Sequence, residues 1–214
     1  MRKRKIGMIA GVLLSGLLLS GCIGSDAESK AEAAESSHTI IEVQKDGNII
    51  ETITEDFSAD YYEEEDLRNM ILSEVAEFNR DAEGDISVDK LEAKSGTITV
   101  RMKYPSADAY TQYNSTPFDN RSLFCGTVAQ AYDAGYSLDV ALKKVGDEEE
   151  TIGKEEILGM GERHMLISEV PFRVNTFDKI LYVSDNVTLL GKSQADMMAD
   201  ENGESLGKYY IIFK

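Results

Sequence analysis

The stretch ISVDKLEAKSGTITVRMKY, residues 86–104, holds two strand-like runs on either side of a turn at residues 94–96. In the second run every other residue from Ile98 to Tyr104 is apolar, and the residues between them are Thr, Arg or Lys. Successive side chains of a strand point to opposite faces, so this alternation predicts a β-hairpin in a sheet with one dry face.

A second hairpin is expected upstream of this one. Residues 39–44 and 49–54 are rich in Ile, Val and Thr, and Asp46-Gly47 lies between them. Asp-Gly favours a tight hairpin turn because both central positions require a positive φ. The two hairpins together predict an antiparallel sheet.

A long helix is expected between the hairpins, over residues 61–80. Asp60 is a suitable N-cap, and residues 63–66 place negative charge in the first turn, where the helix dipole favours it. The apolar residues recur at spacings of three and four; they are Leu67, Met70, Ile71, Val75 and Phe78.

The second half of the chain predicts shorter elements. We expect a helix capped by Ser106 that runs through Tyr113, a helix over 123–134 that stops at Gly135, and a turn or two of helix over 154–160. An acidic loop is expected at 147–150. Strands are expected at 164–168, 172–176, 179–183, 187–190 and 208–213, connected as an antiparallel meander. The predicted fold class is α+β, an antiparallel sheet built from hairpins and packed against one long and several short helices, in a single domain over 39–214.

The first residues have the composition of a targeting segment. Residues 2–5 are all Arg or Lys, and residues 6–19 are uncharged and mostly apolar. This run is shorter than the ~20 apolar residues that a transmembrane helix needs. Residues 1–21 are therefore interpreted as a cleaved signal peptide, and the polar residues 22–38 as a flexible tether.

Leu19-Ser20-Gly21-Cys22 resembles the lipobox of bacterial lipoproteins. The resemblance implies cleavage between Gly21 and Cys22, a diacylglyceryl group on the Cys22 thiol, and a location on the extracytoplasmic side of the cell membrane. Two acyl chains hold a protein on a bilayer stably. The alternative is an ordinary secretory signal with a chance cysteine. Beyond the lipobox, the domain resembles the small uncharacterised lipoproteins of low-GC Gram-positive bacteria.

The acidity of the chain belongs to its exported part. The chain has 22 Lys and Arg against 39 Asp and Glu, a formal charge of -17. Residues 1–21 hold four basic residues and no acidic one, so the mature chain has 22 minus 4, or 18, basic residues and a formal charge of -21. This charge argues against a nucleic-acid partner and predicts that anionic lipid repels the folded domain, which leaves the lipid on Cys22 as the attachment to the membrane.

Residues 79–90 are similar to a calcium-binding EF-hand loop. Asn79, Asp81 and Glu83 match its first three oxygen ligands, Gly84 occupies the sharp turn, and Asp85 follows. The match fails at position twelve, where the bidentate acid is replaced by Lys90. The alternative is a polar connection between a helix and a strand. The sequence therefore assigns no metal site and keeps Asn79, Asp81, Glu83 and Asp85 as weak candidates.

Cys125 is the one thiol that remains once Cys22 is lipidated. A nucleophilic cysteine needs a neighbouring base, and the two histidines of the chain, His38 and His164, are the candidates. A free cysteine among apolar residues is usually a small buried hydrophobic side chain. We interpret Cys125 as a buried free thiol.

The sequence contains no phosphate-binding loop, no complete dinucleotide fingerprint and no His-Glu-x-x-His motif, and it implies no cofactor and no catalytic residue. Its ten tyrosines offer contact surface for a partner. The favoured function is non-enzymatic binding of an unidentified protein or small molecule. The alternatives are an extracytoplasmic hydrolase that uses acidic residues and a calcium-stabilised module built on the 79–90 loop.

Overall fold

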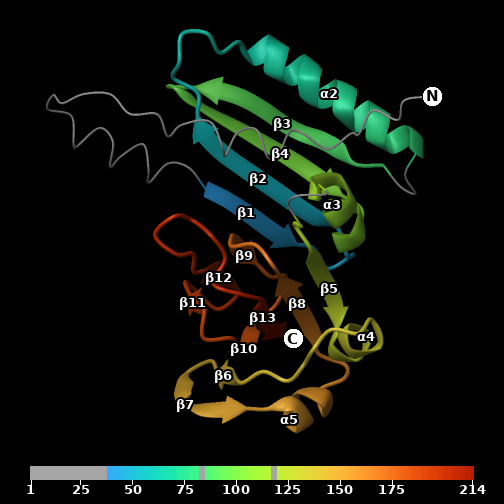
Figure 1. The fold of residues 1–214 in the computed structure, drawn as a ribbon, viewed down its shortest axis with the longest axis vertical. Helices are drawn as coiled ribbons and strands as arrows, with labels where there is room; N and C mark the ends of the chain where they lie inside the picture. The colour runs from blue at the N-terminus through green and yellow to red at the C-terminus, as the bar shows by residue number, and fades with distance from the viewer. Residues whose placement is uncertain (1–37, 82–84, 117–119) are drawn as a thin grey trace, which may run out of the picture.

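The computed structural model describes residues 38–81, 85–116 and 120–214 (Figure 1). Within these ranges the chain forms thirteen strands in two sheets and four helices. The predicted signal peptide, Cys22 and all of the predicted tether except His38 lie outside the described residues. None of the described helices is both long enough and apolar enough to cross a bilayer.

The first sheet, sheet 1, contains both hairpins that the sequence predicts. Its strand order is β11 (Val187–Leu189), β12 (Gln194–Met197), β9 (Arg173–Asn175), β1 (His38–Val43), β2 (Ile49–Asp56), β4 (Thr97–Tyr104) and β3 (Ser87–Lys94). The pair β1 and β9 is parallel, and the other pairs are antiparallel. Gly47 in the turn between β1 and β2 has a φ of 87°, the conformation that the Asp-Gly pair predicts.

The second sheet, sheet 2, is antiparallel throughout. Its order is β5 (Leu123–Thr127), β8 (His164–Ser168), β13 (Tyr209–Phe213), β10 (Ile180–Val183), β6 (Leu142–Lys144) and β7 (Asp147–Ile152). In Figure 1, β1 to β4 of sheet 1 lie in the upper half of the molecule, and sheet 2 lies in the lower half, where β9, β11 and β12 of sheet 1 are also drawn.

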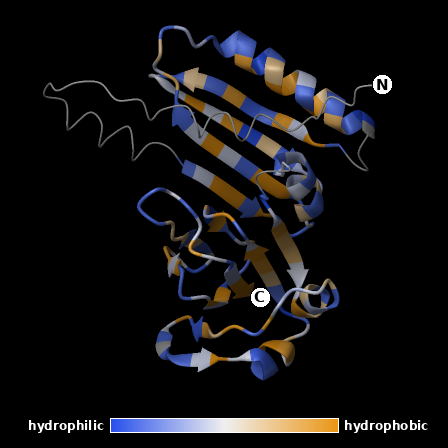
Figure 2. Cartoon of the chain, viewed as in Figure 1, coloured by the Kyte–Doolittle hydropathy of each residue, from blue (hydrophilic) through white to orange (hydrophobic). Residues whose placement is uncertain are grey.

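Helix α2 (Glu64–Asp81) packs against β3, on the face of sheet 1 that carries its apolar side chains (Figure 1). Its buried residues Leu67, Ile71 and Val75 join the core beneath it, and its first turn carries three acidic residues. The helix begins three residues later than the expected start at 61. Apolar and polar bands alternate along the strands below it, as Figure 2 shows.

Three short helices connect the strands. Helix α3 (Ala107–Asn114) begins at the predicted cap, where the Ser106 hydroxyl accepts a hydrogen bond from the Ala109 backbone N at 3.1 Å. Helix α4 (Val128–Asp133) is followed by Gly135 with a φ of 84°, and helix α5 (Lys154–Leu158) lies beside α4.

Three sequence-based expectations are wrong. Residues 123–127, expected in a helix, form β5, because they pair with β8 along their full length. The acidic residues 147–150 are part of β7, not a loop. The strands after 164 do not form a meander: β8, β10 and β13 join sheet 2, whereas β9, β11 and β12 join sheet 1.

Sheet 2 is buried on both faces, which explains the continuous apolar runs of its central strands. Leu166 of β8 faces the large core shared with sheet 1, and its neighbours Met165 and Ile167 face a smaller core under α4 and α5. Strand β13 divides its side chains in the same way. A run that is apolar at every position suits a strand covered on both sides.

Candidate functional site

A carboxylate lies inside the large core. Glu51 is in the middle of β2, with Ile41 of β1 and Met102 of β4 as its register partners, and its side chain is 2% exposed. The Tyr104 hydroxyl donates a hydrogen bond to Glu51 Oε2 at 2.6 Å. Asn114 of α3 donates in turn to the Tyr104 oxygen at 3.3 Å. Buried charges need such partners, because desolvation without compensation is costly.

The environment of Glu51 favours its protonated form. Burial raises the pKa of Glu51, and the hydrogen bond from Tyr104 and the positive charge of Arg121 offset part of that effect. Burial and the nearby Glu51 carboxylate also raise the pKa of Tyr104 well above its usual value, so Tyr104 remains a hydrogen-bond donor at neutral pH. Sequence analysis missed this cluster. The sequence feature that could have revealed it is the acidic residue Glu51 between Ile49 and Ile53, on the face of a strand that is otherwise apolar.

A cleft of about 330 Å³ opens next to this cluster. It is lined by five segments that are distant in sequence: Thr39 of β1, Tyr110 of α3, residues 120 and 121 before β5, residues 169–172 between β8 and β9, and residues 203–205 between β12 and β13. Tyr110 and Arg121 belong both to the wall of the cleft and to the surroundings of Glu51. The cleft therefore lies where elements of the two sheets meet.

The wall of the cleft next to β5 is polar and held in place by hydrogen bonds. The Glu169 carboxylate pairs with Lys208 Nζ at 3.0 Å and accepts a hydrogen bond from the Asn120 side chain. The Glu169 backbone N donates to Ser122 O at 3.2 Å, which places residue 169 beside the segment that carries Arg121. Positive and negative groups are thus neighbours on one side of the cleft.

The loop that bears residues 203–205 is also ordered by a carboxylate. Asp200 Oδ1 accepts hydrogen bonds from the backbone N of Asn202 and of Glu204, both at 2.8 Å. These backbone hydrogen bonds, that from Glu204 first, lower the pKa of Asp200. Gly203 has a φ of 80°, a conformation that favours glycine. The loop is therefore a defined rim, on which the Glu204 side chain is exposed.

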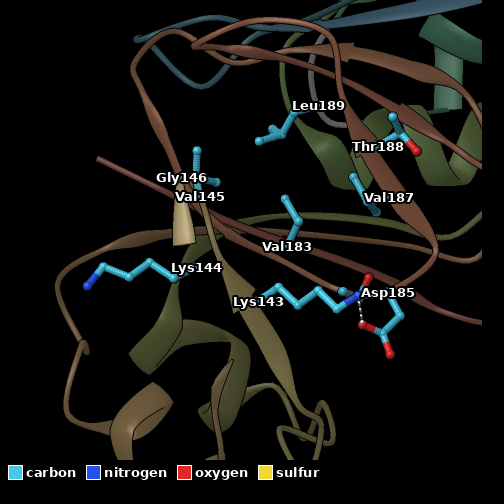
Figure 3. Close-up of a pocket in the computed structure, with 10 residues that line it drawn as sticks. Lys143, Lys144, Val145, Gly146, Val183, Asp185, Val187, Thr188 and Leu189 are labelled. Carbon is cyan, nitrogen blue, oxygen red and sulfur yellow. Dashed lines mark ion pairs between the residues drawn. The ribbon is translucent and has the colours of Figure 1, made fainter. Parts of the chain in front are cut away.

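A second cavity, of about 300 Å³, lies by the turn between β6 and β7. Figure 3 shows Val183, Val187 and Leu189 around it, and Lys143 extending toward Asp185, with which it pairs at 3.1 Å. The neighbouring Lys144 pairs with Glu150 at 2.6 Å. Both lysines of this cavity are thus engaged with acids of the same sheet or the adjoining loop, and the cleft beside Glu51 is the stronger candidate for a ligand site.

The 79–90 loop is described only in part. The Asn79 side chain makes two hydrogen bonds with the backbone of Ile86, at 2.8 and 2.9 Å, and so joins the end of α2 to the residue before β3. Lys90 lies on β3 and pairs with Glu92 at 2.7 Å. The Asp81 side chain and Glu83 lie outside what the structure describes, and Asp85 is exposed. Within the described part of the chain, no group of three or more His, Cys, Asp or Glu side chains could hold a metal ion.

Cys125 is on β5, opposite Leu166 of β8, and is partly buried. Burial raises the pKa of its thiol to about 12, the opposite of the shift that a nucleophilic cysteine needs. The His164 ring stacks on Phe213 at 5.3 Å and meets the edge of Phe177 at 4.9 Å. These contacts place His164 in an aromatic cluster.

Comparison of the chain with protein-family models, with curated proteins and with solved structures finds no match.

Proposed function

We propose that this protein is a lipid-anchored, extracytoplasmic binding protein that holds a small ligand in the cleft beside Glu51. The observation that carries the proposal is the cleft itself. It combines apolar surface with a few polar groups from five chain segments, an arrangement typical of small-molecule sites. Polar groups that are fixed before binding lower the entropic cost of binding.

The location follows from Leu19-Ser20-Gly21-Cys22 and from the charge of the mature chain. Replacing Cys22 by Ser removes the thiol that would carry the lipid. We expect Cys22→Ser to move the protein from the membrane fraction to the medium or periplasmic fraction, as measured by fractionation and immunoblotting. Cys125→Ser is the matched control and should leave the protein on the membrane. Retention of the Cys22→Ser variant would contradict the lipid anchor.

Binding in the cleft is tested by filling it. Glu204→Trp places a large side chain on the rim, whereas Glu201→Trp makes the same change on the same loop outside the cleft. The full chain in detergent micelles is heated with members of a library of neutral, anionic, cationic and zwitterionic metabolites. A ligand at one hundred times its Kd stabilises the fold by about 2.7 kcal/mol.

We expect at least one metabolite to raise the Tm of the wild-type chain and of Glu201→Trp but not that of Glu204→Trp. If no metabolite does so, the proposed binding function fails. The hydrolase and the calcium-stabilised module remain predictions from the sequence, because the described geometry favours neither. Glu51 is the one acidic residue in the described chain that is buried, and it does not line the cleft.

A further inference from the structure

We infer that the cleft accepts a small zwitterion with an apolar side chain, namely an amino acid or a short peptide. The inference rests on the proposed function and names the class of ligand for the same site. It uses three properties of the lining: a cation, two carboxylates, and apolar residues.

Arg121 is the cation that would receive the carboxylate of the ligand. Its guanidinium presents several N–H donors in a plane that matches a carboxylate. Its positive charge also lowers the pKa of the buried Glu51, although burial raises that pKa by more.

Glu169 and Glu204 are the acids that would receive the ammonium group. Glu169 is anchored by Lys208 and Asn120, and each oxygen of a carboxylate can accept more than one hydrogen bond. Glu204 lines the cleft from the 203–205 loop. The lining thus carries two acids and one arginine, and the formal charge of -21 on the mature chain also disfavours a purely anionic ligand.

The remaining wall explains the apolar side chain. Residues 170–172 are Val, Pro and Phe, and Phe172 and Tyr110 of the lining are also part of the large core. Val170 and Pro171 are only partly buried and uncharged, and contact with them favours an aliphatic or aromatic side chain. A volume of about 330 Å³ is near the lower end of the range of small-molecule pockets, which suits a ligand of this size.

The test separates the two charges of the ligand. The probes are L-leucine, L-phenylalanine and leucyl-leucine, each compared with its N-acetyl form, which lacks the ammonium group, and with its C-terminal amide, which lacks the carboxylate. Binding to the full chain in detergent micelles is measured by isothermal titration calorimetry. We expect at least one zwitterion to bind, and each blocked form of it to bind at least about tenfold more weakly, a loss of 1.4 kcal/mol or more.

Two variants assign the charges to residues. Arg121→Gln should weaken the binding of the zwitterion and leave its affinity close to that of its amide. Arg163→Gln removes an exposed arginine that does not line the cleft, and it should change neither affinity. Glu204→Gln should weaken the binding of the zwitterion and leave its affinity close to that of its N-acetyl form. Because Glu204 is exposed, this variant keeps the test valid if Arg121→Gln does not fold.

Three results would overturn the inference. If the N-acetyl forms bind as tightly as the zwitterions, the site takes anions; if the amides do, it takes cations. If no probe binds, the ligand class is wrong. In each case the Glu204→Trp comparison in the metabolite library decides separately whether the cleft binds a ligand at all, so the inference can fail while the proposed function stands.

Discussion

Glu51 is an acidic side chain that the fold buries among apolar residues. It occupies an inward position on a central strand, and its neighbours on that face are apolar. The hydrogen bond from Tyr104 satisfies one carboxylate oxygen, and the neutral form of the acid avoids the cost of a buried charge. A protonated Glu51 is therefore compatible with the core, and an ionised one opposes folding.

The first prediction concerns the dependence of stability on pH. The pKa of Glu51 is higher in the folded chain than its ordinary value of 4.5, so the folded state binds more protons than the unfolded state above that value. Stability from this group is complete below pH 4.5 and is lost as the pH rises through the folded pKa. Glu51→Gln keeps an oxygen that can accept from Tyr104 and removes the titration.

We therefore expect Glu51→Gln to raise the Tm relative to the wild type at pH 7–8 and to change it little near pH 4. For a chain of this size, 1 kcal/mol corresponds to about 2–4 °C. Thermal unfolding followed by circular dichroism measures the difference, and Glu201→Gln, an exposed change, is the control. A Tm difference that does not vary with pH would contradict the role assigned to the Glu51 proton.

At the scale of elements, the junction of β5 and α4 shows how a cap determines a boundary. The Thr127 hydroxyl accepts from Gln130 N at 3.1 Å, and Gln130 Oε1 accepts from Thr127 N at 2.7 Å, which is a capping box. Its S/T-x-x-E/Q pattern is visible in the sequence. The start expected from the sequence, residue 123, is five residues too early, because the sequence-based prediction includes the mostly apolar residues 123–127 in the helix.

The second prediction tests this cap. Thr127→Ala removes the acceptor for Gln130 N, and we expect the free energy of unfolding to fall by about 1 kcal/mol. Thr151→Ala, on the exposed residue of β7, should change it by less than about 0.5 kcal/mol. Urea unfolding of the two variants measures both effects. Equal stabilities would show that the cap does not hold this junction.

The hairpin of β6 and β7 is an element that hydrophobic patterning could not predict. Three of the four residues 147–150 are Glu, and their polarity indicates a loop. In the structure Gly146 takes a φ of 88° in a two-residue turn, and Lys144 pairs across the hairpin with Glu150. The pairing of Lys144 with Tyr182 of β10 then attaches the hairpin to sheet 2. Long-range pairing supplies what local propensity does not.

At the scale of the whole molecule, the chain crosses repeatedly between the sheets. Sheet 1 is started by β1 to β4 and completed by β9, β11 and β12, and sheet 2 is completed by the last strand, β13. The large core contains residues of both sheets. Strands of one sheet lie between strands of the other along the chain, and the two sheets share a core, so we expect them to unfold together.

The third prediction tests this coupling from the smaller core. Ile157 is a fully buried residue of α5 and belongs to the smaller core, away from sheet 1. Ile157→Ala should lower the free energy of unfolding by about 2–5 kcal/mol. Far-ultraviolet circular dichroism reports the whole chain, and labelling of the Cys125 thiol reports β5. Both probes should give the same lowered midpoint, and Leu190→Ala, at an exposed residue, should leave it nearly unchanged. Two separate transitions would contradict a single cooperative unit.

The sequence by itself determined the elements whose signals are local. The alternation in β4, the Asp-Gly turn between β1 and β2, and the Ser106 cap of α3 can each be predicted, because side-chain direction, turn conformation and capping depend on residues only a few positions apart. The lipobox is local in the same sense, and it remains a prediction of the sequence.

Only the tertiary structure decided the rest. The insertion of β9 beside β1, the division of the last strands between two sheets, and the cleft lined by residues from 39 to 205 depend on contacts between distant segments. Such contacts are selected by the burial of apolar surface on both faces of sheet 2, which no short window of sequence contains. The burial of Glu51 beside Tyr104 has the same origin, because β4 and α3 close over it.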